Sequence, residues 1–355
     1  MSKDIIVVGS GLAGMACASY LAKNNHSVTV IEKNSTYGGR LQSISKNGYT
    51  FDSGPSWYWM PDIFDSFFAD FGKSTSDFYD LKRINPGYRV YFGDDDTFDL
   101  EEDLILLKNR LDDLEEGAGD SLQKYLDDAK EKYNVAVQKF MYKPSLSPLE
   151  YIKSDLIKRI GRLNLFRPIS KHIRDHFSDP KIIQMLEFPS LLLGAKPSDT
   201  PSFYSFMNYA DFGLGTFHPK KGMYQVILAM EKLAKEQGVK FNTNSNVDSI
   251  CVENGTVNGI VVNGKKQICD FVLSGADYHH TESLLEKKYR QYSENYWQKK
   301  IFAPPSLLFY VGFDKKLKNV DHHTLFFDVD FDKHAETIYD NPQWPCPKNL
   351  ILFLP

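Results

Sequence analysis

The stretch that decides the fold is residues 4–32, which read DIIVVGSGLAGMACASYLAKNNHSVTVIE. A short apolar run at 4–8 precedes a glycine-rich turn at 9–14, and residues 12–23 have helical character. Another run, at 26–32, is rich in β-branched residues, which favour strands. The order strand, helix, strand predicts a βαβ unit. Continuous apolar strands are typical of a parallel sheet that is covered on both faces.

The turn has the spacing Gly9-x-Gly11-x-x-Gly14, between the first strand and the helix. Gly9 permits a tight turn, Gly11 lets the backbone approach a pyrophosphate, and Gly14 lets helix and strand pack closely. The helix N-terminus offers free N–H groups and the positive end of its dipole to phosphates. Glu32 ends the second strand, where a carboxylate accepts hydrogen bonds from ribose hydroxyls. We therefore predict a dinucleotide site rather than a purely structural glycine turn.

Composition limits the class of protein. The chain has 355 residues, enough for about two domains. Its 42 Lys and Arg against 46 Asp and Glu give a net charge of -4, so we expect no nucleic-acid partner. The 4 cysteines form no C-x-x-C pair and complete no zinc set, so we expect no metal. No apolar run is long enough to cross a membrane, and no signal peptide is expected.

Strand and helix patterns return near residue 215, after a long insertion. Asn-Gly pairs at 254–255 and 263–264 predict two hairpin turns. The insertion opens with a predicted hairpin at 86–100, with an acidic triplet at its turn, and an acidic helical stretch at 101–131. A sheet that is interrupted and then resumes predicts one domain built from separated segments, with a second domain inserted. The elements predicted after the insertion are a helix at 222–237 and strands at 240–242, 247–252, 257–262 and 268–273.

Two further motifs follow the second strand: residues 37–40 (YGGR) and residues 51–56 (FDSGPS). An acid followed by G-G-R distinguishes a flavin site from a nicotinamide site. The order of these motifs resembles the FAD-binding amine oxidase-like superfamily and, within it, the bacterial and fungal type of phytoene desaturase. The family shows a small residue where this chain has Lys221. Later segments agree with the resemblance, at 218–223 (HPKKGM), 246–250 (NVDSI) and 274–277 (SGAD).

The resemblance implies an α/β fold of two domains. A Rossmann-like FAD-binding domain with a parallel sheet would comprise residues 1–85 and 215–285. An inserted α+β domain that binds substrate and faces the membrane would comprise residues 86–214 and 286–355. The FAD-binding residues that the resemblance implies are Gly9, Ser10, Gly11, Ala13, Gly14, Glu32, Lys33, Gly39, Arg40, Leu41, Gly54, Pro55, Ser56, Val247, Ala276 and Asp277.

Each part of FAD has an implied place. The 9–14 turn would hold the diphosphate, with Glu32 at the ribose. Residues 39–41 would lie along the diphosphate and the ribityl chain, and residues 54–56 would lie toward the flavin ring. Val247 would meet the adenine through its backbone, with Ala276 and Asp277 closing that side.

The resemblance also implies the reaction, which is FAD-dependent desaturation of an apolar polyene in carotenoid biosynthesis, first of all phytoene toward lycopene. Diapophytoene desaturase, carotenoid isomerase and 3,4-desaturase are alternatives. A flavin amine oxidase and a non-enzymatic prenyl-binding escort protein are more distant ones. The family continues beyond Pro355, so the chain is expected to lack its C-terminal part. We assign no catalytic residue. Glu150 and Asp211 are candidate proton acceptors, although a surface or structural role is the preferred interpretation.

A basic segment at 150–175 carries one apolar stripe at helical spacing. The pattern fits a helix docked on its own core, and it also fits a helix lying on an anionic bilayer. A lipid-soluble substrate favours the bilayer. We therefore expect a cytoplasmic protein that is peripherally associated with a membrane, and its oligomeric state stays open.

Overall fold

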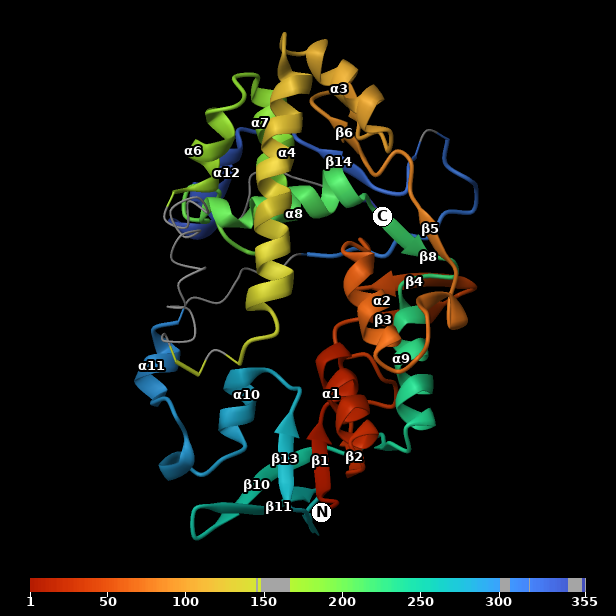
Figure 1. The fold of residues 1–355 in the computed structure, drawn as a ribbon, viewed down its shortest axis with the longest axis vertical. Coiled ribbons are helices and arrows are strands. Elements are labelled where there is room, and N and C mark those ends of the chain that lie inside the picture. Colours follow the sequence, from red (N-terminus) through yellow and green to blue (C-terminus); the bar gives the residue numbers. More distant parts are fainter. Residues whose placement is uncertain (145, 148–166, 301–306, 319, 344–352, 355) are drawn as a thin grey trace. The chain divides into compact units, whose positions relative to one another are not determined.

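The computed structural model describes residues 1–144, 146–147, 167–300, 307–318, 320–343 and 353–354 (Figure 1). The chain divides into two compact units, each assembled from separated segments. The first unit comprises residues 1–58, 64–82 and 218–302, and the second comprises residues 59–63, 83–217 and 303–355. The chain passes from the first unit to the second within strand β5 (Leu81–Arg83), and it returns to the first unit within strand β8 (Phe217–Pro219).

The first unit is built on a parallel sheet with the strand order β13-β1-β2-β9 (Figure 1). The central strand β1 (Asp4–Val8) pairs with both β13 (Phe271–Ser274) and β2 (Ser27–Ile31), and β2 pairs with β9 (Lys240–Asn242). The helix α1 (Leu12–Lys23) connects β1 to β2. The predicted βαβ unit and parallel sheet are therefore confirmed.

Both faces of this sheet are covered, as continuous apolar strands predict. On one face, Val7 and Val30 pack with Ala18 of α1 and Ala234 of α9 (Tyr224–Glu236). On the other face, residues of β1 and β2 pack with β10 (Val247–Glu253) and β11 (Thr256–Val262). The apolar residues that the sequence places on alternate sides of β1 thus enter two separate hydrophobic clusters.

The strands β10, β11 and β12 (Lys265–Ile268) form an antiparallel sheet joined by the two predicted hairpin turns. Asn254 and Gly255 have φ values of 51° and 77°, and Asn263 and Gly264 have values of 46° and 74°. Two successive residues with positive φ are what a type I′ turn requires, and Asn-Gly tolerates this conformation best. Both turn predictions are confirmed.

The predicted single strand at 268–273 is wrong. The strand β12 ends at Ile268 beside β11, and β13 begins at Phe271 beside β1. The change of partner is fixed by Asp270, whose N–H donates to the carbonyl oxygen of Asp4 at 2.8 Å, while its carboxylate accepts from the N–H of Asp4 at 2.9 Å. An apolar run does not reveal that its two halves pair with different sheets.

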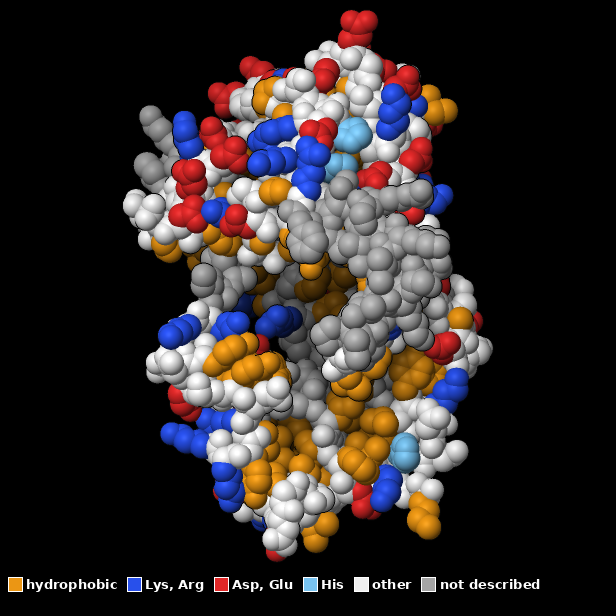
Figure 2. All heavy atoms as spheres, turned by 60° about the vertical axis from the view of Figure 1, so that its left-hand side comes forward, with side chains coloured by type: hydrophobic (Ala, Val, Ile, Leu, Met, Phe, Trp, Pro, Cys, Tyr) orange, Lys and Arg blue, Asp and Glu red, His pale blue; other side chains and the backbone are white. Residues whose placement is uncertain are grey.

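The remaining elements of the first unit lie around this core. Figure 2 shows hydrophobic side chains at its surface, in the lower part of the view, and Ile268, Phe271 and Tyr278 are 83%, 56% and 53% exposed. Among the described elements of this kind are β3 (Gln42–Lys46), β4 (Tyr49–Ser53), α10 (Tyr278–Ser283) and α11 (Glu294–Gln298), with α2 (Pro61–Ala69) beginning in the second unit.

The second unit combines a mixed sheet with helices. Strands β6 (Arg89–Tyr91) and β7 (Thr97–Asp99) form the predicted hairpin, and β14 (Thr324–Phe326) pairs parallel to β6. Helices α3 and α4 confirm the predicted acidic helical stretch. The α-helices in the described part of this unit are α3 (Leu104–Asp112), α4 (Ala118–Val135), α6 (Ile169–Arg174), α7 (Pro180–Leu192), α8 (Phe206–Asn208) and α12 (Phe331–Tyr339), and β15 (Phe353–Leu354) pairs with β14.

A buried lysine joins the helices of the second unit. The side chain of Lys132 on α4 is fully buried, and its Nζ donates to the carboxylate of Asp128 at 2.6 Å. It also donates to the carbonyl oxygen of Ser202 and to Oγ of Ser205, each at 3.2 Å. Three acceptors for three N–H groups compensate the burial of this ammonium.

No helix in the described ranges is long and apolar enough to cross a membrane. Most of the basic segment predicted at 150–175 lies outside the described residues, because the structure leaves out residues 148–166. Its last part contains the short helix α6.

Candidate cofactor site

Backbone hydrogen bonds hold the glycine turn after β1 in place. The N–H of Gly9 donates to the carbonyl oxygen of Ile31 at 2.8 Å, and the N–H of Gly38 donates to that of Ser10 at 3.0 Å. Gly11 and Gly38 lie opposite each other in a parallel bridge. The G-G-R segment therefore lies directly against the predicted phosphate turn.

The glycines of this turn have different roles. A Cβ on Gly14 would collide with the carbonyl oxygen of Gly9, and a Cβ on Gly275 would come within 2.8 Å of the Cα of Gly14. These glycines therefore permit close packing. At Gly11 the nearest atom to a Cβ would be the Cα of Gly39, at 4.0 Å. The space beside Gly11 is open, as the approach of a diphosphate requires.

The N-terminus of α1 faces this site without a capping side chain. Gly11 is its N-cap residue, and the neighbouring hydroxyl of Ser10 donates to Glu32 instead, at 2.6 Å. Ala13, in the first turn, is exposed. The first N–H groups of α1 and the positive end of its dipole therefore suit an anionic group.

A cation lies next to the same turn. A Cβ on Gly39 would come within 3.2 Å of the Cα of Gly11, and Arg40 follows directly in the chain. Arg40 and Lys33 are exposed, and neither forms a hydrogen bond or an ion pair with any residue in the described ranges. An exposed arginine that directly follows the segment packed against this turn suits a diphosphate group, because a guanidinium can bind phosphate oxygens through two parallel hydrogen bonds.

Glu32 is buried, with 4% of its surface exposed. Its Oε2 accepts from the N–H and the O–H of Ser10, at 2.9 and 2.6 Å, and Oε1 accepts from the N–H of Asn34 at 2.9 Å. A carboxylate offers about four lone-pair directions, so these three hydrogen bonds leave room for one more donor. Glu32 thus ties the glycine turn to the end of β2, a role that the sequence analysis missed.

Residues 39–41 and 54–56 are brought together by a hairpin. Strands β3 and β4 begin just after Leu41 and end just before Gly54, so the chain returns to its starting point. Gly54 has a φ of 115°, and a Cβ there would collide with the carbonyl oxygen of Arg40. Leu41 is buried, whereas Gly54 and Pro55 are exposed and Ser56 is half-buried.

The predicted adenine-side residues are distributed more widely. The segment before Val247 reaches Glu32, directly after β2, because the N–H of Ser245 donates to the carbonyl oxygen of Glu32 at 2.8 Å. The side chain of Val247 is buried in the core, which leaves its backbone as the part that can contact a ligand. The backbone nitrogen of Ala276 lies next to the turn, 3.7 Å from the Cβ position of Gly9.

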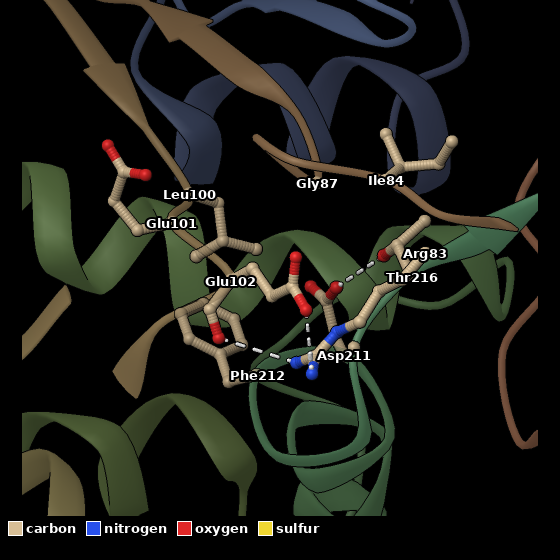
Figure 3. A pocket seen from close by; sticks show the side chains of 10 residues that line it. Arg83, Ile84, Gly87, Leu100, Glu101, Glu102, Asp211, Phe212 and Thr216 are labelled. Atoms are coloured by element: carbon tan, nitrogen blue, oxygen red, sulfur yellow. Dashed lines mark hydrogen bonds and ion pairs between the residues drawn. The ribbon is translucent and has the colours of Figure 1, made fainter. Parts of the chain in front are cut away.

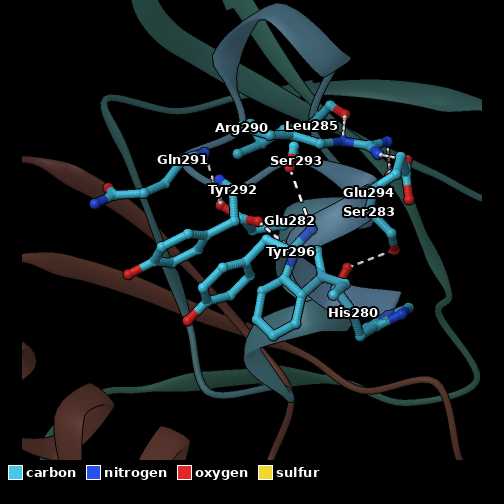
Figure 4. A network of polar contacts seen from close by, with 11 residues as sticks. His280, Glu282, Ser283, Leu285, Arg290, Gln291, Tyr292, Ser293, Glu294 and Tyr296 are labelled. Atoms are coloured by element: carbon cyan, nitrogen blue, oxygen red, sulfur yellow. Dashed lines mark hydrogen bonds and ion pairs between the residues drawn. The ribbon is translucent and has the colours of Figure 1, made fainter. Parts of the chain in front are cut away.

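The carboxylate of Asp277 is engaged elsewhere. It caps α10 and accepts from the N–H of His280 at 3.2 Å. Within α10, the buried Glu282 accepts from the N–H of Gln291 at 2.7 Å and from Nε1 of Trp297 at 2.9 Å (Figure 4). These hydrogen bonds fix the segment after Asp277 as part of the first unit, and they satisfy the charge of Glu282.

The sequence analysis missed two side chains next to the 54–56 loop, Asp52 and His218. Oδ2 of Asp52 lies 3.5 Å from Nε2 of His218, and Nδ1 of His218 lies 3.4 Å from the carbonyl oxygen of Ser56. Both residues belong to motifs already noticed, FDSGPS and HPKKGM. The two motifs were therefore visible in the sequence, but the sequence does not show that they lie next to each other in the fold.

Of the two candidate proton acceptors, Glu150 lies outside the described residues. Asp211 belongs to the second unit and is 2% exposed, so the alternative of a surface role is wrong. Its carboxylate accepts from Oγ1 of Thr216 and from the hydroxyl of Tyr88, each at 3.1 Å. Burial raises the pKa of Asp211 to about 7, because desolvation penalises the charged form.

Asp211 lines a small cavity of about 10 Å³ within the second unit (Figure 3). A volume of this size holds about one water molecule. At the same cavity, the guanidinium of Arg83 pairs with Glu102 at 3.1 Å. The cavity is lined by Arg83, Ile84, Gly87, Leu100, Glu101, Glu102, Asp211, Phe212, Gly215 and Thr216.

Known proteins resemble this chain along its length. The family model described as flavin containing amine oxidoreductase matches residues 12–345. A carotenoid 3,4-desaturase from Haloarcula japonica is 35% identical over 356 residues, which cover 99% of this chain and 72% of that protein. A 4,4'-diapophytoene desaturase (4,4'-diaponeurosporene-forming) from Staphylococcus haemolyticus is 30% identical over 357 residues, which cover 99% and 71%.

Solved structures share the fold. An oxidoreductase from Methanosarcina mazei superimposes with a TM-score of 0.53 at 20% sequence identity, over 79% of this chain. The chain spans 61% of the length of that structure. The glycine turn, the G-G-R segment and the sequence relatives agree on the cofactor class. The chain therefore belongs to the flavin-containing amine oxidoreductase family, whose members are FAD-dependent oxidoreductases, and within that family it groups with the carotenoid desaturases.

Proposed function

We propose that the protein binds FAD at the glycine turn of its first unit and uses it to desaturate a carotenoid precursor. The observation that carries the proposal is the open space beside Gly11, at the N-terminus of α1 and next to Arg40. In this proposal the first unit is the FAD-binding domain and the second unit binds the polyene. Bound FAD supplies the acceptor for the two electrons removed from a C–C bond.

The side chains then have binding and positioning roles. The first N–H groups of α1 and the guanidinium of Arg40 bind the diphosphate, and Glu32 accepts from a ribose hydroxyl in the lone-pair direction that Ser10 and Asn34 leave. The 54–56 loop lies toward the flavin ring, and the backbone at Val247 faces the adenine.

Substitutions at two glycines separate folding from binding. Gly14→Ala should destabilise the first unit by about 3 kcal/mol, because its Cβ collides with the turn. The Cβ that Gly11→Ala adds would meet only open space, so the urea-unfolding midpoint of this variant should stay close to that of the parent. It should nevertheless weaken FAD binding by about tenfold or more, because its Cβ occupies the place of the diphosphate. Unchanged FAD affinity in a folded Gly11→Ala variant would refute the proposed site.

The finer substrate proposal is phytoene, converted toward lycopene. Desaturation at the 3,4 position and desaturation of diapophytoene compete with it, because the two relatives described above carry those names. The protein should be expressed in cells that make only C40 or only C30 precursors, and the products identified by their absorbance and mass. Lycopene from phytoene supports the proposal. Products from the C30 precursor alone, or at the 3,4 bond alone, would replace it, and peroxide formed from added amines would favour an amine oxidase.

We also propose that the second unit contacts a membrane surface. Met141, Tyr142 and Leu146 are 51%, 67% and 85% exposed, directly before the basic segment at 150–175. Tyr142→Ser and the triple reversal Lys158→Glu, Arg159→Glu, Arg162→Glu should each reduce co-sedimentation with anionic liposomes. Ile268→Ser, at an exposed position of the first unit, is the matched control. Unchanged sedimentation of the triple variant would exclude this contact.

A further inference from the structure

Asp52 joins two motifs that lie far apart in the sequence. It belongs to β4, which leads into the 54–56 loop, and Oδ2 accepts from the N–H of Met223 at 2.8 Å. Met223 is the N-cap residue of α9, so the negative charge lies at the positive end of that helix dipole. Gly222 has a φ of 100°, and a Cβ there would come within 2.8 Å of Oδ1 of Asp52. The close approach therefore requires a glycine at this position.

His218 extends this link to the loop itself. Its Nε2 lies 3.5 Å from Oδ2 of Asp52, and its Nδ1 lies 3.4 Å from the carbonyl oxygen of Ser56. A carboxylate and a carbonyl oxygen can only accept hydrogen bonds. The two ring nitrogens of His218 thus each face an oxygen that accepts hydrogen bonds. The side chains of His218 and Asp52 are 17% and 20% exposed, so this contact is largely shielded from water.

The 54–56 loop is thus held at both ends. At Gly54 the loop packs against the carbonyl oxygen of Arg40, where a Cβ would collide. At Ser56 its carbonyl oxygen is within reach of the His218 ring. All of these residues belong to the first unit. The loop position is set by the G-G-R segment from one side and by Asp52 with His218 from the other.

We infer that Asp52 and His218 are positioning residues that fix the 54–56 loop against the bound flavin ring, with Asp52 acting through His218. The inference rests on the proposed function, which places this loop toward the ring. An imidazole ring held at the loop by Asp52 would orient the Ser56 carbonyl and set the polarity beside the flavin ring, and both properties affect the spectrum and the reduction potential of a flavin.

The test uses the full chain with FAD. Asp52→Asn keeps the size of the side chain and an oxygen that can accept from Met223, but replaces the carboxylate that faces His218 with a neutral amide. His218→Gln removes the ring. Asp80→Asn is the matched control, because Asp80 forms an exposed ion pair with Lys220 in the same unit. FAD affinity, the visible flavin spectrum and the reduction potential are measured for each variant and for the double variant of Asp52 and His218.

Both single variants should shift the flavin bands and the potential and weaken FAD binding by about tenfold, while Asp80→Asn matches the parent. Because Asp52 acts through His218, the double variant should lose no more than His218→Gln alone. Additive losses, or variants with the parental spectrum and affinity, would overturn the inference while the proposed function stands. A parent chain that binds no FAD would overturn both.

A measurement without cofactor covers a variant that fails to bind FAD. Amide hydrogen exchange at Gly54, Ser56 and Trp57 of the FAD-free protein should be faster in Asp52→Asn than in the parent, while exchange in β1 and β2 stays the same. Equal exchange of the loop in both proteins would overturn the positioning role.

Discussion

Asp211→Asn tests whether a buried carboxyl makes the stability of the second unit depend on pH. Asp211 is 2% exposed, and its two oxygens accept from Thr216 and Tyr88 at 3.1 Å. Burial raises its pKa from 3.8 to about 7. The asparagine amide has nearly the same shape and keeps one oxygen acceptor, but it cannot ionise.

The size and the sign of the effect follow from the pKa. A rise of about 3 pKa units corresponds to about 4 kcal/mol, at about 1.36 kcal/mol per unit. The folded protein binds this proton more tightly than the unfolded chain. The stabilisation from proton binding is therefore complete below about pH 4, and it is lost as the pH rises to about 7. The free energy of unfolding of Asp211→Asn, measured relative to that of the parent, should therefore rise between about pH 4 and about pH 7. Above about pH 7 the difference between the two proteins should stay constant.

Urea unfolding followed by tryptophan fluorescence, at several pH values between 5 and 8, measures this difference. Asp95→Asn is the control, because Asp95 is exposed at the turn of the β6–β7 hairpin. The free energy of unfolding of the control should follow the parent at every pH. If the parent and Asp211→Asn give parallel curves, Asp211 does not bind a proton near neutral pH and the reasoning fails.

Three further substitutions test single contacts. Lys221 has a φ of 73°, so Lys221→Gly should raise the free energy of unfolding by up to about 1 kcal/mol. Equal thermal stability of parent and variant would contradict this. Glu32→Ala leaves its buried donors unpaired and should cost about 2 kcal/mol in urea unfolding even without FAD. A loss that appears only with FAD would instead assign Glu32 to the ribose alone. Lys132→Met removes the buried cation from Asp128 and should cost about 3 kcal/mol, whereas Lys124→Met, exposed on the same helix, should cost little. Equal unfolding midpoints for these two lysine variants would refute the role of the buried contacts.

Local patterns predicted the fold well. The βαβ unit follows from residues 4–32 because its strands are apolar on both faces and its turn has glycines where backbone must meet backbone. The Asn-Gly turns follow from the preference of these residues for positive φ. The split at Asp270 was missed, because strand patterns do not show which sheet a strand joins.

The site was predicted less completely than the fold. Glycine spacing predicted the turn, because the collision at Gly14 depends on residues close in the sequence. The contact between Asp52 and His218 depends on the path of the chain through the second unit, which no local pattern contains. The environment of Asp211 also depends on Tyr88, which is 123 residues away in the sequence and donates to its carboxylate. The positive φ of Lys221 explains why a small residue suits this position, and nothing in the structure explains the lysine.

The order of the strands has a consequence for synthesis on the ribosome. The central strand β1 ends at Val8, and its partner β13 begins at Phe271, which is 271 − 8 = 263 residues later. At about 5–20 residues per second, β1 waits roughly 13 to 50 s for that neighbour. Residues 83–217 of the second unit emerge during this interval. The nascent chain therefore carries an incomplete apolar sheet for tens of seconds, which is the period when a chaperone that shields strand edges would contribute most to yield.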